Sequence, residues 1–402
     1  MVFRNSKVIK YFALIVFLIF NINGVSTSNS TGLNLISKTK TTAKKKDKEG
    51  IPKYPAALTE NVSFKLDSVF KRYNKRQDFH GSVLVAKNGK LIFSKQYGYA
   101  DFGKKIKLDN QNTFQLASVS KQFTAASILI LFEKGLLKLD DKVTKYYPDF
   151  PYEDVTIRHL LNHTSGLPQY FYLAEKEWKK EKAPTNAEMM EMMAEFKLQH
   201  YFKSGSRFDY SNTGYFVLAS LVEKISGKSY PDFVEEHIFK PLDMTNSYVY
   251  RFEQDGIVDN QLYGFRIYRG WRHIKIPGTV NDAITGDKNV YSTAEDLFKW
   301  INGLNSGKII SKSTLDQMYT KGLTKYGKKV PYGFGFRIDD KDVEKVVYHY
   351  GKWNGFATSI KQYTDSEITI ITLEHSNFRS MNHLNETVKR IVVQNFDEDV
   401  EI

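Results

Sequence analysis

Ser118 and Lys121 are the residues whose types and spacing most favour nucleophilic chemistry in this sequence. A serine hydroxyl is a poor nucleophile near neutral pH and needs an adjacent base. A lysine three residues along a helix lies beside the serine, and burial or a neighbouring cation lowers the pKa of its amine. The pair therefore predicts a serine nucleophile activated by lysine, placed at a helix start whose free N–H groups face developing negative charge.

The same serine–lysine spacing occurs twice more, so spacing alone does not distinguish Ser118. Ser37 and Lys40 lie in a polar segment where no pocket is expected, and Ser68 and Lys71 lie on an amphipathic helix that is predicted to turn them towards solvent. Ser118 differs because it follows a short extended segment and opens a strongly apolar helix. The alternative interpretation is a helix-capping serine followed by a surface lysine.

Tyr210 and Asn212 form the one Tyr-x-Asn motif of the chain. A tyrosine hydroxyl held near a cationic lysine can ionise and pass protons. The asparagine amide can fix the lysine or hold a substrate carbonyl. An ordinary aromatic loop is the alternative, since the chain has 25 tyrosines.

A third motif, His349-Tyr350-Gly351-Lys352, is expected at the end of a strand. Glycine there lets a substrate backbone lie against the strand edge. The backbone N–H of the next residue could pair with that of Ser118 as an oxyanion hole. His349 could hydrogen-bond the substrate or the proton relay. A histidine whose hydrogen bonds are satisfied within the strand is the alternative.

The order Ser-x-x-Lys, Tyr-x-Asn, His-x-Gly resembles the serine beta-lactamase and penicillin-binding-protein superfamily. Within it, the chain is most similar to the class C beta-lactamase-related group, which includes DD-carboxypeptidases, D-aminopeptidases and esterases. The resemblance covers roughly residues 60–395. It also includes the segments 116–124, 160–168, 208–215 and 286–293.

This resemblance implies roles for the motif residues. Ser118 would be acylated, Lys121 and Tyr210 would move protons, and water would then release the acyl group. Asn212, His349 and Gly351 would contact substrate, and the oxyanion N–H groups would come from Ser118 and Lys352. No cofactor is implied.

His349 is a departure from the family pattern, because many members have a lysine there that helps to bind the substrate carboxylate. The histidine favours the DD-carboxypeptidase, D-aminopeptidase and esterase side of the group. Lys352 or an arginine could still supply positive charge. A true class C beta-lactamase is the alternative, and a catalytically silent envelope-binding protein on the same fold is a further one.

The helices and strands expected around these residues indicate an α+β fold of the α/β-sandwich type. A helical pattern over 58–76 precedes two β-rich runs joined by Asn88-Gly89, a strong hairpin signal. Helices are expected over 114–135 and, after a Ser292/Glu295 capping box, up to residue 300. The last expected elements are strands at 332–338, 343–349, 356–362 and 368–373, then a helix over 380–394.

Strands at both chain ends predict one antiparallel sheet, flanked by helices and joined to a mostly helical middle lobe. The expected domain covers residues 54–400, with a sheet lobe of 54–115 and 290–400 and a helical lobe of 116–289. Aromatic loops at 170–172 and 263–271 are expected to shape the acyl pocket.

The N-terminus carries targeting signals. Residues 1–26 combine a basic start, an apolar stretch at 11–22 and small residues at 24–26, which predicts a cleaved signal peptide. The apolar stretch is shorter than the roughly 20 residues of a membrane span, so no stable span is expected after cleavage. Residues 27–53 predict a polar, basic linker. The protein is therefore expected to be exported, periplasmic or secreted; tethering by an uncleaved segment is the alternative.

The composition is globular, with 41% hydrophobic and 14% aromatic residues. The absence of cysteine excludes disulfides, thiolate sites and a lipoprotein anchor. Of the net charge of +13, residues 1–49 hold nine lysines or arginines against two acids. No recognition motif accompanies this charge, so no nucleic-acid partner is expected. The expected partner is a small-molecule or peptide substrate, with a fragment of peptidoglycan as one candidate.

Two other patterns resemble a metal site and a phosphate-binding site. His159 and His163 have a zinc-like spacing, but the glutamate that usually follows the first histidine is absent, so no metal site is expected. Gly98–Lys104 matches most of a phosphate-binding loop, yet Lys105 stands where serine or threonine is required.

Overall fold

The fold is described from a computed structural model, which covers residues 51–77, 79–256, 258–341 and 344–396. The predicted signal peptide and residues 27–50 of the predicted linker lie outside these ranges. Across the described ranges, no helix is both long enough and apolar enough to cross a lipid bilayer.

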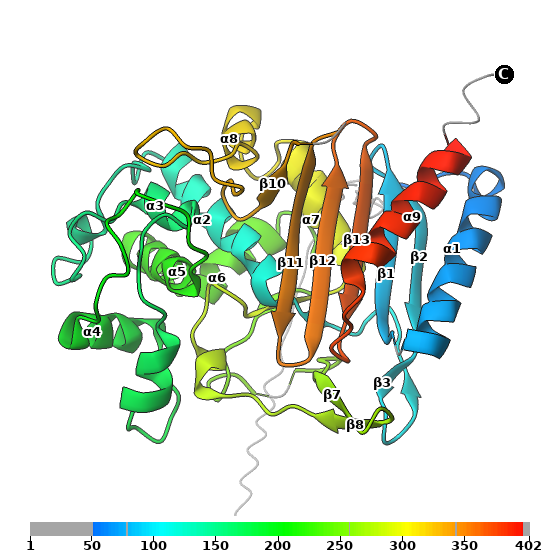
Figure 1. Cartoon of the computed structure of the whole chain (residues 1–402), viewed down its shortest axis with the longest axis horizontal. Helices are drawn as coiled ribbons and strands as arrows, with labels where there is room; N and C mark the ends of the chain where they lie inside the picture. Colours follow the sequence, from blue (N-terminus) through cyan, green and yellow to red (C-terminus); the bar gives the residue numbers. More distant parts are fainter. Residues whose placement is uncertain (1–50, 78, 257, 342–343, 397–402) are drawn as a thin grey trace, which may run out of the picture. The chain divides into compact units, whose positions relative to one another are not determined.

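A six-stranded sheet forms one part of the fold (Figure 1). Its strands, in spatial order, are β10 (Arg337–Asp339), β11 (Val346–Trp353), β12 (Phe356–Tyr363), β13 (Ile368–Glu374), β1 (Gly81–Lys87) and β2 (Lys90–Tyr97). Every neighbouring pair is antiparallel, and the N-terminal β1 pairs with the C-terminal β13 in the register Leu84 to Ile371. The predicted antiparallel sheet built from both chain ends is confirmed.

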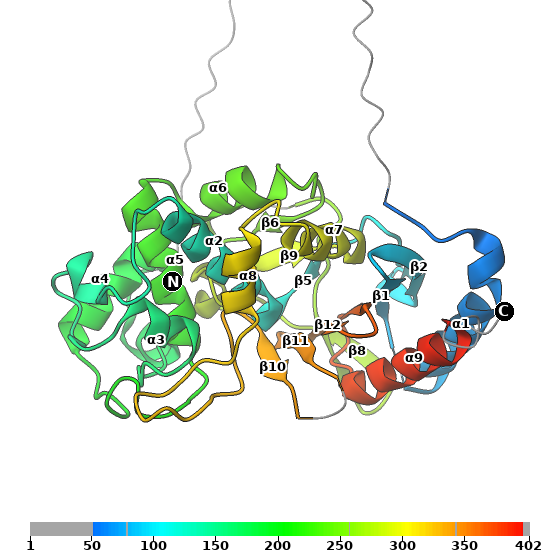
Figure 2. The same ribbon diagram turned by 90° about the horizontal axis from the view of Figure 1, so that it is seen from above.

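Two terminal helices, α1 (Ala56–Gln77) and α9 (Met381–Phe396), lie together on one face of this sheet (Figures 1 and 2). In α1, Val62, Leu66, Phe70 and Tyr73 are buried, at the three-to-four-residue spacing of one helix face. These side chains form one apolar cluster with α9 and with the face of β1 that is turned towards the two helices. The hydrophobic pattern of the two chain ends therefore fixes this layer.

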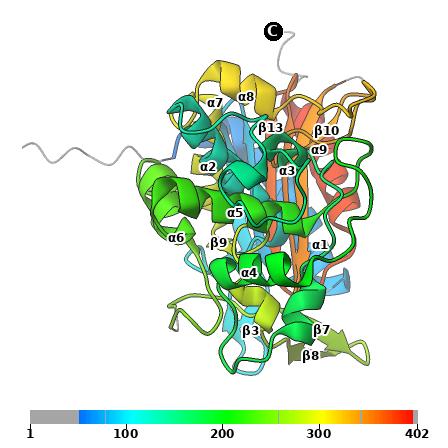
Figure 3. The same ribbon diagram turned by 90° about the vertical axis from the view of Figure 1, so that its left-hand side faces the viewer.

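The opposite face of the sheet packs against α7 (Ala294–Asn305) and the turn before α2 (Lys121–Glu133). Figure 3 looks onto the helical part, in which α2 lies behind α5 (Asn212–Ser226). Most of α2 is buried on every side, because its apolar residues are not confined to one face of the helix. The remaining helices are α3 (Ile157–Leu161), α4 (Asn186–Phe196), α6 (Tyr230–Val234) and α8 (Lys312–Met318).

Short strands connect the six-stranded sheet with the helical part of the fold. One small sheet contains β5 (Phe114–Gln115), β9 (Val290–Ser292) and β6 (Tyr248–Val249). Two hairpin-like pairs are β3 (Tyr99–Asp101) with β4 (Ile106–Lys107), and β7 (Phe265–Tyr268) with β8 (Arg272–Lys275).

The structure corrects several predicted boundaries. Phe114 does not begin a helix, because Phe114 and Gln115 pair with β9. The cap of α7 is Thr293, which accepts from the Asp296 N–H, since Ser292 belongs to β9. Of the strand predicted over 332–338, only the end at Arg337–Asp339 is extended strand. The Asn88-Gly89 hairpin between β1 and β2 is confirmed.

Candidate active site

Ser118 lies in a tight turn between β5 and α2. The turn is a 3₁₀ segment, Ala117–Ser120, entered through Ala117 at φ +49°, a backbone conformation that alanine rarely adopts. Ser120 is buried and its hydroxyl accepts from the Val290 N–H at 3.0 Å, whereas Ser118 is partly exposed. The turn therefore fixes its own backbone through Ser120 and leaves the Ser118 hydroxyl accessible.

Lys121 is the first residue of α2, and its side chain is fully buried. Its Nζ lies 3.2 Å from Ser118 Oγ, 2.8 Å from Asn212 Oδ1 and 2.8 Å from the Asp287 main-chain oxygen. An ammonium group has three N–H donors, and these three acceptors match them. A neutral amine would still donate to the amide and main-chain oxygens, and its lone pair could then accept the Ser118 proton.

The electrostatics around Lys121 shift its protonation balance towards the neutral amine. Burial lowers the pKa of Lys121 to about 8, with the positive charge of Arg337 acting in the same direction and the Asp287 carboxylate opposing it. Burial disfavours the charged form of an amine because the interior solvates charge poorly. Near pH 8, Lys121 can therefore gain and lose a proton.

Tyr210 and Asn212 enter the site at the start of α5. Ser211 caps this helix by accepting from the Gly214 N–H, so its neighbours on both sides are held in place. The Tyr210 ring centroid lies 5.1 Å from Lys121 Nζ, and its hydroxyl is buried without a hydrogen-bond partner among the described residues. Burial raises the pKa of Tyr210, while the nearby Ser118 hydroxyl and Arg337 lower it.

His349 lies in the middle of β11, opposite Ile360, and not at the strand end that was predicted. Its Nδ1 lies 2.8 Å from the Tyr350 main-chain oxygen, which can only accept, so Nδ1 carries the proton. Its Nε2 then accepts from the Tyr332 hydroxyl at 2.8 Å. Burial holds the pKa of His349 well below its usual range. The structure thus contains a neutral histidine with both ring nitrogens in use.

Gly351 and Lys352 bring β11 against the serine turn. A Cβ on Gly351 would lie 2.2 Å from the Leu116 main-chain oxygen, so only glycine permits this approach. Thr358 of β12 donates to the same oxygen at 2.6 Å. Side chains alternate along a strand, so the exposed Lys352 ammonium lies on the face away from His349 and Gly351. The charge of Lys352 therefore lies away from the site.

Replacing Gly351 with alanine is expected to move β11 away from Ser118. A misplacement of about 1 Å near a reacting centre costs about 10²-fold, so kcat/KM for an aryl ester should fall by about that factor. Gly256→Ala is the matched control, because a Cβ at that glycine would meet nothing within 4 Å. Equal kcat/KM values for the two variants would contradict the close approach inferred for β11.

Several residues of the site were not singled out from the sequence. Arg337 of β10 places its guanidinium carbon 5.1 Å from the Tyr210 ring centroid, and no described carboxylate pairs with it. Tyr332 holds His349, and Asp287 supplies an acceptor to Lys121. Asp287 lies in the segment 286–293 that carries the family resemblance, so that signal existed. Arg337 offered no local signal, because only the pairing of β10 with β11 brings it here.

The two histidines with a zinc-like spacing have structural contacts. His159 Nδ1 accepts from the Thr156 N–H at 3.3 Å, completing the cap of α3. The fully buried His163 accepts from the Ser211 N–H at 3.1 Å, beside Tyr210. In the described part of the chain, no three His, Asp or Glu side chains are grouped to hold a metal ion.

The two predicted aromatic loops differ in their placement. Tyr170 is buried, and Phe171 stacks against Trp353 at the end of β11, with ring centroids 5.5 Å apart. Trp353 is fixed further by its indole N–H, which donates to Asp282 at 2.5 Å. Trp271 is 74% exposed in the turn between β7 and β8. The first loop thus lies beside the end of β11, and the second contacts the turn after β11, where a Cβ on Gly264 would lie 1.7 Å from the Asn354 main-chain oxygen.

Comparison with known proteins agrees with this geometry. The chain is 35% identical over 328 residues to a penicillin-binding protein of Bacillus subtilis (strain 168), covering 79% of this chain and 73% of the relative. The structure of an octameric penicillin-binding protein homologue from Pyrococcus abyssi aligns with a TM-score of 0.71 and 27% identity, over 82% of this chain and 77% of that one. D-amino acid amidase from Ochrobactrum anthropi SV3 shares the fold, with a TM-score of 0.68 and 21% identity over 84% of this chain and 99% of that one.

Fold and site together define a serine hydrolase of the serine beta-lactamase and penicillin-binding-protein superfamily. The chain belongs to the beta-lactamase family, whose model matches residues 66–393. The resemblance expected from the three ordered motifs is confirmed, as is the α+β fold.

Proposed function

We propose that this protein is exported and hydrolyses an amide or ester through an acyl intermediate on Ser118. The observation that carries this proposal is the contact of 3.2 Å between Ser118 Oγ and the Nζ of a buried lysine with a lowered pKa. A serine nucleophile needs such a base within hydrogen-bond reach. The basic, then apolar, N-terminus supports export.

In the acylation step, neutral Lys121 accepts the hydroxyl proton as Ser118 Oγ forms a bond to the substrate carbonyl carbon. The carbonyl oxygen becomes an oxyanion, which the backbone N–H groups of Ser118 and Lys352 stabilise. Collapse of this intermediate breaks the bond to the leaving amine or alcohol. The leaving group takes this proton from Lys121 through Tyr210, whose ring centroid lies 5.1 Å from Lys121 Nζ and whose hydroxyl has no hydrogen-bond partner among the described residues.

In the deacylation step, water replaces the leaving group and attacks the acyl carbon. Lys121 accepts the proton of this water through Tyr210, and Ser118 Oγ takes that proton from Lys121 when the ester bond breaks. The Asn212 amide holds Lys121 through Oδ1, so its N–H groups remain free to donate to a substrate carbonyl. The proton that Ser118 loses thus leaves with the amine or alcohol, and the proton that it regains comes from the water.

The proposed substrate is of the kind that DD-carboxypeptidases, D-aminopeptidases or esterases cleave, such as a peptide derived from peptidoglycan. A neutral, internally paired His349 does not supply the cation that would hold a carboxylate in its place. Arg337 is a cation near Tyr210 without a described carboxylate partner, so it suits a substrate with a free carboxylate. A true class C beta-lactamase is the second candidate, supported by the relatedness to penicillin-binding proteins.

A turnover panel tests the proposed function. It compares a D-alanyl dipeptide, a short-chain aryl ester and a chromogenic cephalosporin, with the Ser118→Ala protein as the blank. We expect turnover of the dipeptide or the ester to exceed that of the cephalosporin. Arg337→Gln should raise KM for the dipeptide by about tenfold, the order of one lost charged hydrogen bond, and leave KM for the uncharged ester unchanged.

Each other outcome of the panel identifies a different alternative. Faster turnover of the cephalosporin would favour the beta-lactamase. Muropeptide binding without any turnover and without an acyl-enzyme would favour a catalytically silent envelope-binding protein.

A further inference from the structure

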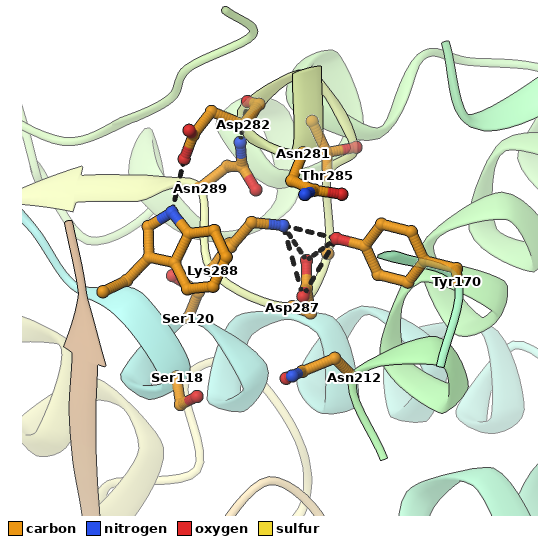
Figure 4. A network of polar contacts seen from close by, with 12 residues as sticks. Ser118, Ser120, Tyr170, Asn212, Asn281, Asp282, Thr285, Asp287, Lys288 and Asn289 are labelled. Atoms are coloured by element: carbon orange, nitrogen blue, oxygen red, sulfur yellow. Dashed lines mark hydrogen bonds and ion pairs between the residues drawn. The ribbon is translucent and has the colours of Figure 1, made fainter. Parts of the chain in front are cut away.

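Asp287 and Lys288 form a buried ion pair (Figure 4). The pair is next to Lys121, since Lys121 Nζ donates to the Asp287 main-chain oxygen. Asp287 is 0% exposed and Lys288 is 3% exposed, with Lys288 Nζ 3.1 Å from Oδ1 and 3.3 Å from Oδ2 of the carboxylate. The Tyr170 hydroxyl donates to the same carboxylate at 3.3 Å and contacts the Lys288 ammonium. Even a well-paired buried ion pair adds little net stability, because the cost of desolvating two charges offsets their attraction, so stability alone does not explain this pair.

The backbone around the pair is attached to the start of α2. The Asp287 main-chain oxygen accepts from Lys121 Nζ at 2.8 Å. On one side, Thr124 donates to the Gly286 oxygen at 2.5 Å, and on the other, the Val290 N–H donates to Ser120 Oγ at 3.0 Å. The segment that carries the pair is therefore held against the same turn that presents Ser118.

Lys121 is surrounded by charges of both signs. Titratable groups approach it from five elements or their adjoining loops: His163, Tyr210, Tyr215, Asp287, Lys288, Arg337 and His349. Burial keeps both histidines neutral by lowering their pKa, and it raises the pKa of both tyrosines. The charged neighbours are therefore the carboxylate of Asp287 and the cations of Lys288 and Arg337.

We propose that Asp287 and Lys288 are a positioning pair for Lys121. The Asp287 main-chain oxygen holds the amine beside Ser118, and the Lys288 ammonium offsets the Asp287 carboxylate, which would otherwise keep Lys121 protonated. The proposal rests on the proposed role of Lys121 as the base. Without Lys288, a lone buried carboxylate would face Lys121 and favour its charged, inactive form.

The test measures how fast a fluorophosphonate probe labels the protein across a range of pH. In this reaction Ser118 Oγ forms a bond to phosphorus, fluoride leaves, and the hydroxyl proton passes to Lys121. The labelling rate of the wild type should rise with pH as Lys121 becomes neutral. In Lys288→Met the midpoint of this rise should move up by about 1 pH unit or more, as expected for an unbalanced charge within about 6 Å.

Two further variants separate charge from shape. The double variant Asp287→Asn with Lys288→Met removes both charges, and its midpoint should return towards that of the wild type. Lys299→Met is the matched control, because Lys299 also pairs with a buried aspartate, Asp296, at 2.8 Å but lies in α7 outside the site. Its midpoint should not change.

The outcomes separate this proposal from the proposed function. An unchanged midpoint in Lys288→Met, or a double variant that keeps the raised midpoint, would overturn the role of the pair. Labelling of Ser118→Ala at the wild-type rate would instead overturn the proposed nucleophile. The midpoint of the labelling rate does not depend on how much of the protein is folded. If the methionine variant does not fold, Lys288→Gln replaces it in the test, because glutamine can still donate to Asp287.

Discussion

Replacing Ser118 with alanine should produce the largest loss of turnover, for every substrate. Removing a serine nucleophile that acts as a unit with its base typically costs about 10⁴-fold or more in kcat. The physical reason is that the neighbouring Ser120 hydroxyl cannot take its place, since it is buried and bonded to the Val290 N–H. Initial rates with the aryl ester and the D-alanyl dipeptide measure this loss.

A matched control for this substitution exists in the chain. Ser68 and Lys71 have the same spacing, but Ser68 is exposed on α1, where it donates to the Phe64 main-chain oxygen, and Lys71 pairs with Asp67 at 2.8 Å. Ser68→Ala should keep the wild-type rate. If Ser118→Ala kept it as well, the proposed nucleophile would be wrong.

Replacing Lys121 with methionine or arginine should produce the second largest loss. A general base contributes about 10²- to 10⁴-fold, and kcat/KM should fall by about that factor in both variants. Arginine keeps the positive charge, but it stays protonated throughout the accessible pH range and cannot accept the serine proton. An arginine variant with near wild-type activity would show that Lys121 supplies only charge.

The pH profile adds a signed test of the same residue. Because burial lowers the pKa of Lys121 to about 8, the amine is protonated and inactive well below pH 8 and neutral above it. The wild-type kcat/KM should therefore rise with pH through a midpoint near 8. The residual activity of Lys121→Met should lack this rise.

Local patterns in the sequence were sufficient for much of the fold. The apolar spacing of α1, the Asn88-Gly89 turn and the β-rich runs of β12 and β13 each depend on neighbouring residues only. The pairing of β1 with β13 followed from having strands at both chain ends. The boundaries that were wrong, at Phe114 and Ser292, depend on pairing between β5 and β9, which are far apart in the sequence.

In the candidate site, too, some residues could be predicted from local sequence and others could not. The motif residues Ser118, Lys121 and Asn212 were singled out by type and spacing, and the structure brings them within hydrogen-bond distance. Arg337 enters only through the register of β10 with β11. His349 could not be predicted as neutral, because its state depends on the Tyr332 hydroxyl that holds Nε2.

The pair beside the site shows a further limit. Asp287 and Lys288 are adjacent charged residues, which a sequence alone would assign to a solvated surface. Their burial follows from the packing of their segment against the start of α2, where Thr124 and Ser120 bond to its backbone. Two adjacent charged residues that the sequence alone would place on the surface are therefore buried in the folded protein.

Mass spectrometry of the intact protein, after brief exposure to a slowly released ester or a fluorophosphonate, tests the central claim most directly. The account predicts one added acyl or phosphonyl group in the wild type, mapped by peptide fragmentation to Ser118, and no adduct in Ser118→Ala. An adduct on any other residue, or equal labelling of the alanine variant, would contradict it.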